Sequence, residues 1–225
     1  MAPLRIGIFF QRVQLSDIVG IDLIANCSTE YIKNAAEFGF GDLLPLAVEM
    51  AFVYISETLE PTVTTAGVRI SPTHTYETAP VDLDILLVGG PPYSVRPPAS
   101  LEYLRKLKAA MDVNGGTIVS TCVGGMWLAD AGILDGRKAT TNRGALLTAR
   151  DIHQSVTWVD QRWVVDDDGG KTKFWTSGGA GCGIDMLAVF AKERFDEKIA
   201  MAAWNALDFD PTVRGQLYED SSDNK

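Results

Sequence analysis

Cys122 stands where an apolar, strand-like run changes into a helix-like run, and a nucleophile is well placed at such a turn. The strand-like run covers residues 117–120, and Gly124 and Gly125 follow the cysteine. A sharp strand-to-helix turn lifts one side chain off the sheet, while the dipole of the new helix points at the sulfur. The sequence therefore predicts a reactive thiol with a lowered pKa. The alternative is a buried structural cysteine, since free cysteines are among the most buried residues.

Gly89 and Gly90 end a second apolar run, residues 85–88, just before Pro91. In open α/β sheets, ligands bind beyond the carboxyl ends of the strands, and Gly90 and Cys122 both emerge there. We expect the N–H groups of Gly90 and Val123 to form an oxyanion hole facing an atom bonded to the sulfur. Gly89 and Gly124 are expected to line the substrate pocket. A plain turn is the alternative for the glycine pair.

Strand-like and helix-like runs alternate along the chain, which predicts an open, mostly parallel sheet covered on both faces. Apolar runs at residues 4–10, 85–88 and 117–120 are typical of buried parallel strands. Ser100 is a candidate cap for a helix that ends near Gly115. Residues 156–159, 162–165 and 173–176 predict an antiparallel edge. Late helices are expected at 183–195 and 199–207, before a frayed polar tail at 219–225.

Several motifs resemble the ThiJ/PfpI superfamily, which is related to the class I glutamine amidotransferases. Cys122-Val-Gly-Gly and residues 128–141 are similar to its nucleophile elbow, and residues 6–10, 84–91 and 176–186 are similar to its first strand, its Gly-Gly strand and the segment before its late helix. The markers span residues 4 to 190 in family order. The resemblance implies a flavodoxin-like three-layer α/β/α sandwich with a mostly parallel central sheet and a nucleophile elbow. It also implies a homodimer.

Asp17-Ile-Val-Gly20 resembles the Asp-x-x-Gly motif of the isocyanide hydratase branch of that superfamily. The resemblance implies that Asp17 lies beside Cys122 and transfers a proton while the thiol converts an isocyanide into an N-formamide. Aspartate is also a favoured helix N-cap, so capping of the helix that follows is the alternative role of Asp17. Two other functions stay open: a glyoxalase or deglycase acting on α-oxoaldehydes, and a redox sensor or chaperone-like protein.

The chain departs from many superfamily members at two positions. Val123 replaces a small or polar residue after the nucleophile, and Asn142 stands where a histidine is common. The only histidines, His74 and His153, fall elsewhere, which favours a carboxylate as the partner of the thiol. Asn142 either points at the site in place of that histidine or caps the turn that follows it.

Composition excludes several classes of function. The 225 residues fit one domain, 1–225, and the net charge of −9 argues against a nucleic-acid partner. The longest apolar stretch is too short to cross a membrane, and the N-terminal apolar run is too short for a signal peptide, so we expect a cytoplasmic protein. The spacing of Cys27, Cys122 and Cys182 fits neither disulfides nor zinc. No Gly-x-Gly-x-x-Gly follows the first strand, and no cofactor is expected.

Overall fold

A seven-stranded sheet forms the centre of the protein, with strand order β10-β11-β7-β6-β1-β2-β5. The structure, a computed structural model, describes residues 2–167, 170–209 and 214–218. The strands of this sheet are β1 (Leu4–Phe9), β2 (Met50–Ser56), β5 (His74–Thr75), β6 (Ile85–Val88), β7 (Gly116–Ser120), β10 (Trp163–Asp166) and β11 (Thr172–Ser177). Every neighbouring pair is parallel except β10 and β11. The mostly parallel sheet predicted from the sequence is therefore confirmed.

Two small sheets lie outside the central one. β3 (Thr62–Val63) pairs with β4 (Arg69–Ile70), and β8 (Lys138–Ala139) pairs in parallel with β9 (Thr157–Trp158). The prediction that residues 156–159 join the antiparallel edge is wrong, because the chain returns beside β8, where Val159 N–H donates to Ala139 O. The edge itself, β10 with β11, is confirmed. β2 was not predicted as a strand.

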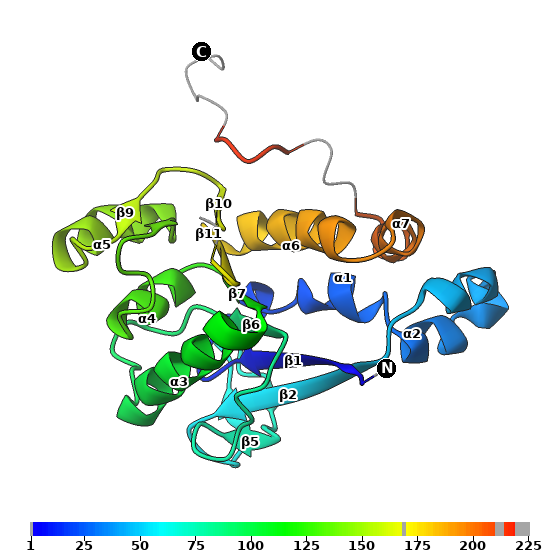
Figure 1. Ribbon diagram of the computed structural model, residues 1–225, viewed down its shortest axis with the longest axis horizontal. Coiled ribbons are helices and arrows are strands. Elements are labelled where there is room, and N and C mark those ends of the chain that lie inside the picture. Colours follow the sequence, from blue (N-terminus) through cyan, green and yellow to red (C-terminus); the bar gives the residue numbers. More distant parts are fainter. Residues whose placement is uncertain (1, 168–169, 210–213, 219–225) are drawn as a thin grey trace.

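Helices cover both faces of the sheet (Figure 1), which confirms the three-layer sandwich. They are α1 (Ile21–Ala25), α2 (Thr29–Asn34), α3 (Pro98–Asn114), α4 (Gly124–Asp130), α5 (Leu146–Ile152), α6 (Ala180–Arg194) and α7 (Glu197–Asn205), with 3₁₀ turns at Leu15–Asp17, Ala36–Phe38, Gly41–Leu46 and Arg143–Ala145. None of the helices in the described ranges has the length and apolar character needed to cross a bilayer. The tail at 219–225 lies outside the described residues.

Ser100 does not cap α3 as predicted. The helix begins at Pro98, whose fixed φ suits the first turn of a helix. The Ser100 hydroxyl instead donates to Pro97 O and accepts from Trp127 Nε1 at 3.0 Å. Ser100 thus links the start of α3 to α4, the helix that begins directly after Cys122.

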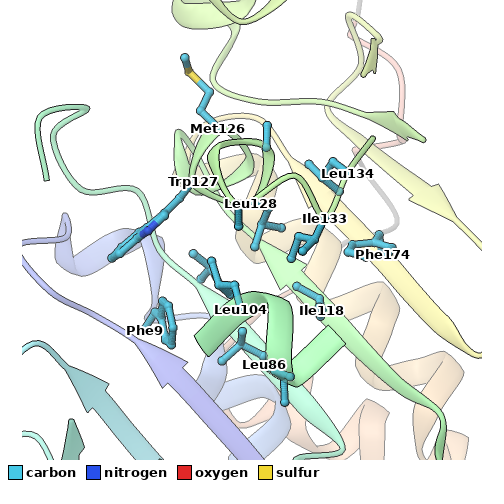
Figure 2. Close-up of a cluster of buried hydrophobic side chains, with 14 of the residues drawn as sticks. Phe9, Leu86, Leu104, Ile118, Met126, Trp127, Leu128, Ile133, Leu134 and Phe174 are labelled. Atoms are coloured by element: carbon cyan, nitrogen blue, oxygen red, sulfur yellow. The ribbon is translucent and has the colours of Figure 1, made fainter. Parts of the chain in front are cut away.

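The two faces of the sheet have separate cores, because successive side chains of a strand point to opposite sides. Leu86 of β6 packs with α3 and α4, whereas Ile85 and Leu87 pack with α1, α6 and α7. Figure 2 shows the first of these cores, in which Trp127 lies close to Phe9. The Trp127 side chain is completely buried. Its packing fixes the helix that supports Cys122.

Candidate active site

Cys122 has the strained backbone expected of a nucleophile elbow. Its φ is +54°, a left-handed value that few residues other than glycine adopt. Cys122 N–H donates to Gly178 O at 2.6 Å, and Cys122 O accepts from the Thr141 hydroxyl at 2.9 Å and from Asn142 N–H at 3.2 Å. The loops after β8 and β11 therefore hold the turn in place. Sequence reasoning missed Thr141 because its role depends on a backbone atom of a distant loop.

Gly124 and Gly125 allow the new helix to pass close to neighbouring backbone. A Cβ atom at Gly124 would lie 2.4 Å from Val88 O, and one at Gly125 would lie 2.7 Å from Thr140 O. Both distances are impossible for a real side chain. Gly124, which the sequence predicts to line the substrate pocket, is buried against the end of β6. Its role is to let α4 begin directly beneath Cys122.

Gly89, the other glycine predicted to line the substrate pocket, packs closely at the end of β6. It is buried, its N–H donates to Phe9 O at 3.3 Å, and a Cβ atom there would lie 2.9 Å from Val13. The close approach brings the loop after β1 against the end of β6. That loop carries Asp17 toward the thiol.

Asp17 lies in the 3₁₀ turn after β1, and only 1% of its surface is exposed. Its Oδ2 accepts from Gly90 N–H at 3.2 Å, whereas Oδ1 has no hydrogen-bond partner among the described residues. The Thr121 hydroxyl donates to Asp17 O at 2.7 Å and ties this loop to the residue before the nucleophile. No side chain caps α1, which Gly20 precedes. The capping role considered for Asp17 is therefore absent.

The thiol and the carboxyl group meet at Gly90. A Cβ atom on Gly90 would lie 2.9 Å from Cys122 Cβ, 3.1 Å from Asp17 Oδ2 and 2.8 Å from Val123 N. The three groups thus surround one small space that any side chain at position 90 would fill. Both predicted partners, Cys122 and Asp17, are brought together there.

Gly90 and Val123, the two residues of the predicted oxyanion hole, lie next to each other at the thiol, since a Cβ atom on Gly90 would lie 2.8 Å from Val123 N. Gly90 N–H donates to Asp17 Oδ2, so this donor orients the carboxylate. Val123 N–H favours the charged form of Cys122 and lowers the pKa of its thiol.

Asn142 combines the two roles that the sequence left open. Its Nδ2 donates to Cys122 Sγ at 3.3 Å, while its Oδ1 accepts from Gly144 N–H at 2.9 Å and caps the turn Arg143–Ala145. Because the cap fixes one end of the amide, the other end stays directed at the sulfur. Asn142 therefore supplies a neutral donor where a histidine could supply a charge.

Electrostatics in this site differ from the sequence-based prediction. Burial raises the pKa of Asp17 from 3.8 to about 6, although the Gly90 hydrogen bond opposes the change. Burial and the nearby Asp17 charge also raise the pKa of the Cys122 thiol, against the lowering effects of Asn142 and Val123 N–H. The prediction of a lowered thiol pKa is wrong, because desolvation and a like charge outweigh the dipole of the short helix α4.

The remaining cysteines and histidines do not contact Cys122. Cys27 is fully buried, its sulfur lies 3.6 Å from Leu23 O, and burial raises its pKa to about 12. His74 Nδ1 lies 2.9 Å from the Thr73 hydroxyl, and His153 Nε2 lies 3.2 Å from Asp130 Oδ1. In the described part of the chain, no three His, Cys, Asp or Glu side chains gather in a way that could hold a metal ion.

Comparison with known proteins identifies the family of this chain. Residues 29–193 match the DJ-1/PfpI family. The chain belongs to the DJ-1/PfpI family. The matched range contains Gly90, Cys122 and Asn142, while Asp17 precedes it.

Individual relatives are distant in sequence. The chain is 26% identical over 170 residues to the isonitrile hydratase of Pseudomonas putida, covering 76% of this chain and 71% of that protein. A ThiJ/PfpI family protein from Pseudomonas syringae superimposes with a TM-score of 0.72 at 20% identity, over 100% of this chain and 81% of that one. Drosophila melanogaster DJ-1beta has a TM-score of 0.65 at 14% identity, over 93% and 100% of the two chains. These structural similarities establish the DJ-1/PfpI fold.

Proposed function

We propose that this protein hydrates an isocyanide to an N-formamide, with Cys122 as nucleophile and Asp17 as the proton-transfer group. The observation that carries the proposal is the buried carboxyl group of Asp17, held by Gly90 N–H beside the thiol, at a site where no histidine contacts the sulfur within the described ranges. The similarity to an isonitrile hydratase supports the same reaction. All of the chemistry uses side chains and water.

The raised pKa values determine where the proton begins. At neutral pH, Asp17 is largely ionised because its pKa is about 6, whereas the Cys122 thiol keeps its proton. Asp17 therefore acts first as a general base and takes the thiol proton as sulfur attacks the terminal carbon of the isocyanide. A C–S bond forms, and the protonated Asp17 then gives its proton to the same carbon. The product of this step is a thioimidate on Cys122.

Water completes the reaction by hydrolysing the thioimidate on Cys122. Asp17, again ionised, takes a proton from a water molecule that adds to the thioimidate carbon, and it gives this proton to the nitrogen. The remaining hydroxyl proton then passes to Asp17 as the C=O bond forms and the C–S bond breaks, Asp17 returns this proton to the sulfur, and the N-formamide leaves. The sum is one isocyanide and one water consumed for one N-formamide formed. Asn142 Nδ2 and Val123 N–H stabilise the negative charge on sulfur when this bond breaks.

A direct test measures formamide production from p-nitrophenyl isocyanide with the wild type and three variants. Cys122→Ala should abolish turnover, and Asp17→Asn should lower it by about 10² or more, the usual contribution of a general acid–base group. Cys182→Ala is the matched control, because Cys182 is another partly exposed thiol and makes no contact with Asp17. It should retain at least half of the activity.

Parallel reactions separate this proposal from its alternatives. If methylglyoxal were converted to lactate through Cys122 while no isocyanide was consumed, the protein would be a glyoxalase. If neither compound was consumed and Cys122 was oxidised reversibly by peroxide, the redox role would replace the enzymatic one. Formamide production that survived loss of the Cys122 thiol would exclude the mechanism.

A further inference from the structure

Residues 214–218 lie against the start of β10, where Gln216 O accepts from Arg162 N–H, whereas α7 lies at the far end of α6 (Figure 1). Arg162 anchors this segment: its Nη1 donates to Gly215 O at 2.7 Å, and its N–H donates to Gln216 O at 2.9 Å. Gln216 Nε2 in turn donates to Trp163 O at 2.8 Å. Arg162 is itself buried and ion-paired with buried Asp185. The segment is therefore fixed by specific contacts with β10 and α6.

Tyr218 is the residue of this segment that approaches the thiol site. Its hydroxyl lies 3.9 Å from Cys182 Sγ at the start of α6, and it occupies the space beside Gly178, where a Cβ atom would lie 2.6 Å from the hydroxyl oxygen. The Arg143 guanidinium lies over the Tyr218 ring at 4.4 Å from its centre. The same guanidinium is ion-paired with Asp160, whose Oδ1 lies 3.0 Å from Arg143 Nε. Tyr218 therefore contacts two loops that are distant in sequence.

Both of these loops hold Cys122. Gly178 O accepts the Cys122 N–H at 2.6 Å and so fixes the strained backbone of the nucleophile. Arg143 directly follows Asn142, whose amide donates to Cys122 Sγ. The same amide packs against the residue after Gly178, since a Cβ atom at Gly179 would lie 3.7 Å from Asn142 Nδ2. A ring wedged between Arg143 and Gly178 thus keeps the amide and the carbonyl at fixed positions around the cysteine.

We propose that Tyr218 is a positioning residue of the active site, which holds Asn142 and Gly178 against Cys122. It acts through these two residues and not on the substrate. The inference concerns the same thiol as the proposed hydratase, but its first readout is the reactivity of Cys122. It can therefore succeed or fail whatever reaction the protein catalyses.

The test follows alkylation of Cys122 by iodoacetamide as a function of pH, with peptide mass spectrometry to separate Cys122 from Cys182. The Asn142 hydrogen bond lowers the thiol pKa, so a loosened amide should move the alkylation profile to higher pH. We expect Tyr218→Ala to slow alkylation at pH 8 by about threefold or more, as the partial loss of one hydrogen bond predicts. Leu217→Ala is the matched control, because that neighbouring side chain is 64% exposed and should leave the profile unchanged.

A double-mutant comparison distinguishes positioning from general loosening of the protein. Asn142→Ala should shift the profile in the same direction, and Tyr218→Ala in the Asn142→Ala background should add nothing, because the group that Tyr218 positions is gone. Arg143→Ala should reproduce part of the shift even if Tyr218→Ala folds poorly, as a thermal melt would reveal. An unchanged profile in both Tyr218→Ala and Arg143→Ala, or full additivity in the double variant, would overturn the proposal.

Discussion

Replacement of Asp17 by asparagine should change the pH dependence of stability in a direction that only a buried, functional carboxyl group explains. Asparagine keeps an acceptor oxygen for Gly90 N–H and nearly the same volume, but it carries no charge to desolvate. In the wild type, Asp17 is 1% exposed and its Oδ1 has no partner among the described residues. Ionisation of this group therefore opposes folding.

The magnitude follows from the pKa of Asp17, which burial raises from 3.8 to about 6. A raised pKa means that the stability is complete only below about pH 3.8, where the carboxyl group is protonated in the folded and the unfolded chain alike, and that it is lost as the pH rises from there through about 6. The full loss is about 3 kcal/mol of unfolding free energy at pH 8, of which about 1.4 kcal/mol is lost between pH 5 and pH 8. The Asp17→Asn variant keeps this unfolding free energy at high pH, because asparagine does not ionise.

Urea unfolding of both proteins at pH 5 and pH 8 measures the effect. We expect the unfolding free energy of Asp17→Asn, relative to the wild type, to rise by about 1.4 kcal/mol between the two pH values. The comparison across pH cancels any constant difference in packing between the two side chains. The same variant should have lost most of its turnover at pH 8.

An equal pH dependence in the two proteins would refute the reasoning, because it would mean that Asp17 ionises as easily in the folded protein as in the unfolded chain. A relative change of the opposite sign would indicate that the carboxylate is stabilised by the fold. In either case Asp17 would be unsuited to carry a proton at neutral pH.

The turnover rate should fall about tenfold for each pH unit below about 6, because only ionised Asp17 accepts the thiol proton, and a pH-rate profile checks this. Gly90→Ala should abolish turnover and cost about 1–3 kcal/mol in urea unfolding, because the new methyl group would lie 2.9 Å from Cys122 Cβ; full activity would contradict the arrangement around Gly90. Trp127→Ala should destabilise the protein by about 3–5 kcal/mol in the same assay, since the side chain is fully buried. Light scattering should give a dimer mass at micromolar concentration, and a monomer mass would remove that prediction.

The sequence by itself determined the fold class and indicated Cys122 and Asp17, the two residues to which we assign the proposed reaction. The apolar runs before Gly89 and Cys122 are long and end sharply at non-apolar residues, so they can be recognised as buried parallel strands. The motifs around them follow the family order. Local pattern was sufficient there because strand, turn and glycine are neighbours in the chain. The same approach missed β2 (Met50–Ser56), whose apolar stretch begins before the strand and hides its start.

The electrostatics of the site were decided by the tertiary structure. The sequence places a helix N-terminus after Cys122, which favours a lowered thiol pKa, but it does not reveal how much water the fold removes or how close Asp17 comes. Those two quantities raise the pKa of the thiol instead. Desolvation depends on every element that packs around a group, so no local pattern can specify it.

The partners of the backbone donors were also decided by the tertiary structure. The sequence suggests Gly90 N–H as an oxyanion donor, yet the loop after β1 brings the Asp17 carboxyl group to this N–H. The role proposed for Tyr218 likewise depends on a segment more than 90 residues after Cys122. The identity and spacing of the residues determine which hydrogen-bond donors and acceptors a chain can offer. Which donor meets which acceptor depends on how distant loops pack at one end of the sheet, and that packing follows from the buried surface of the whole fold.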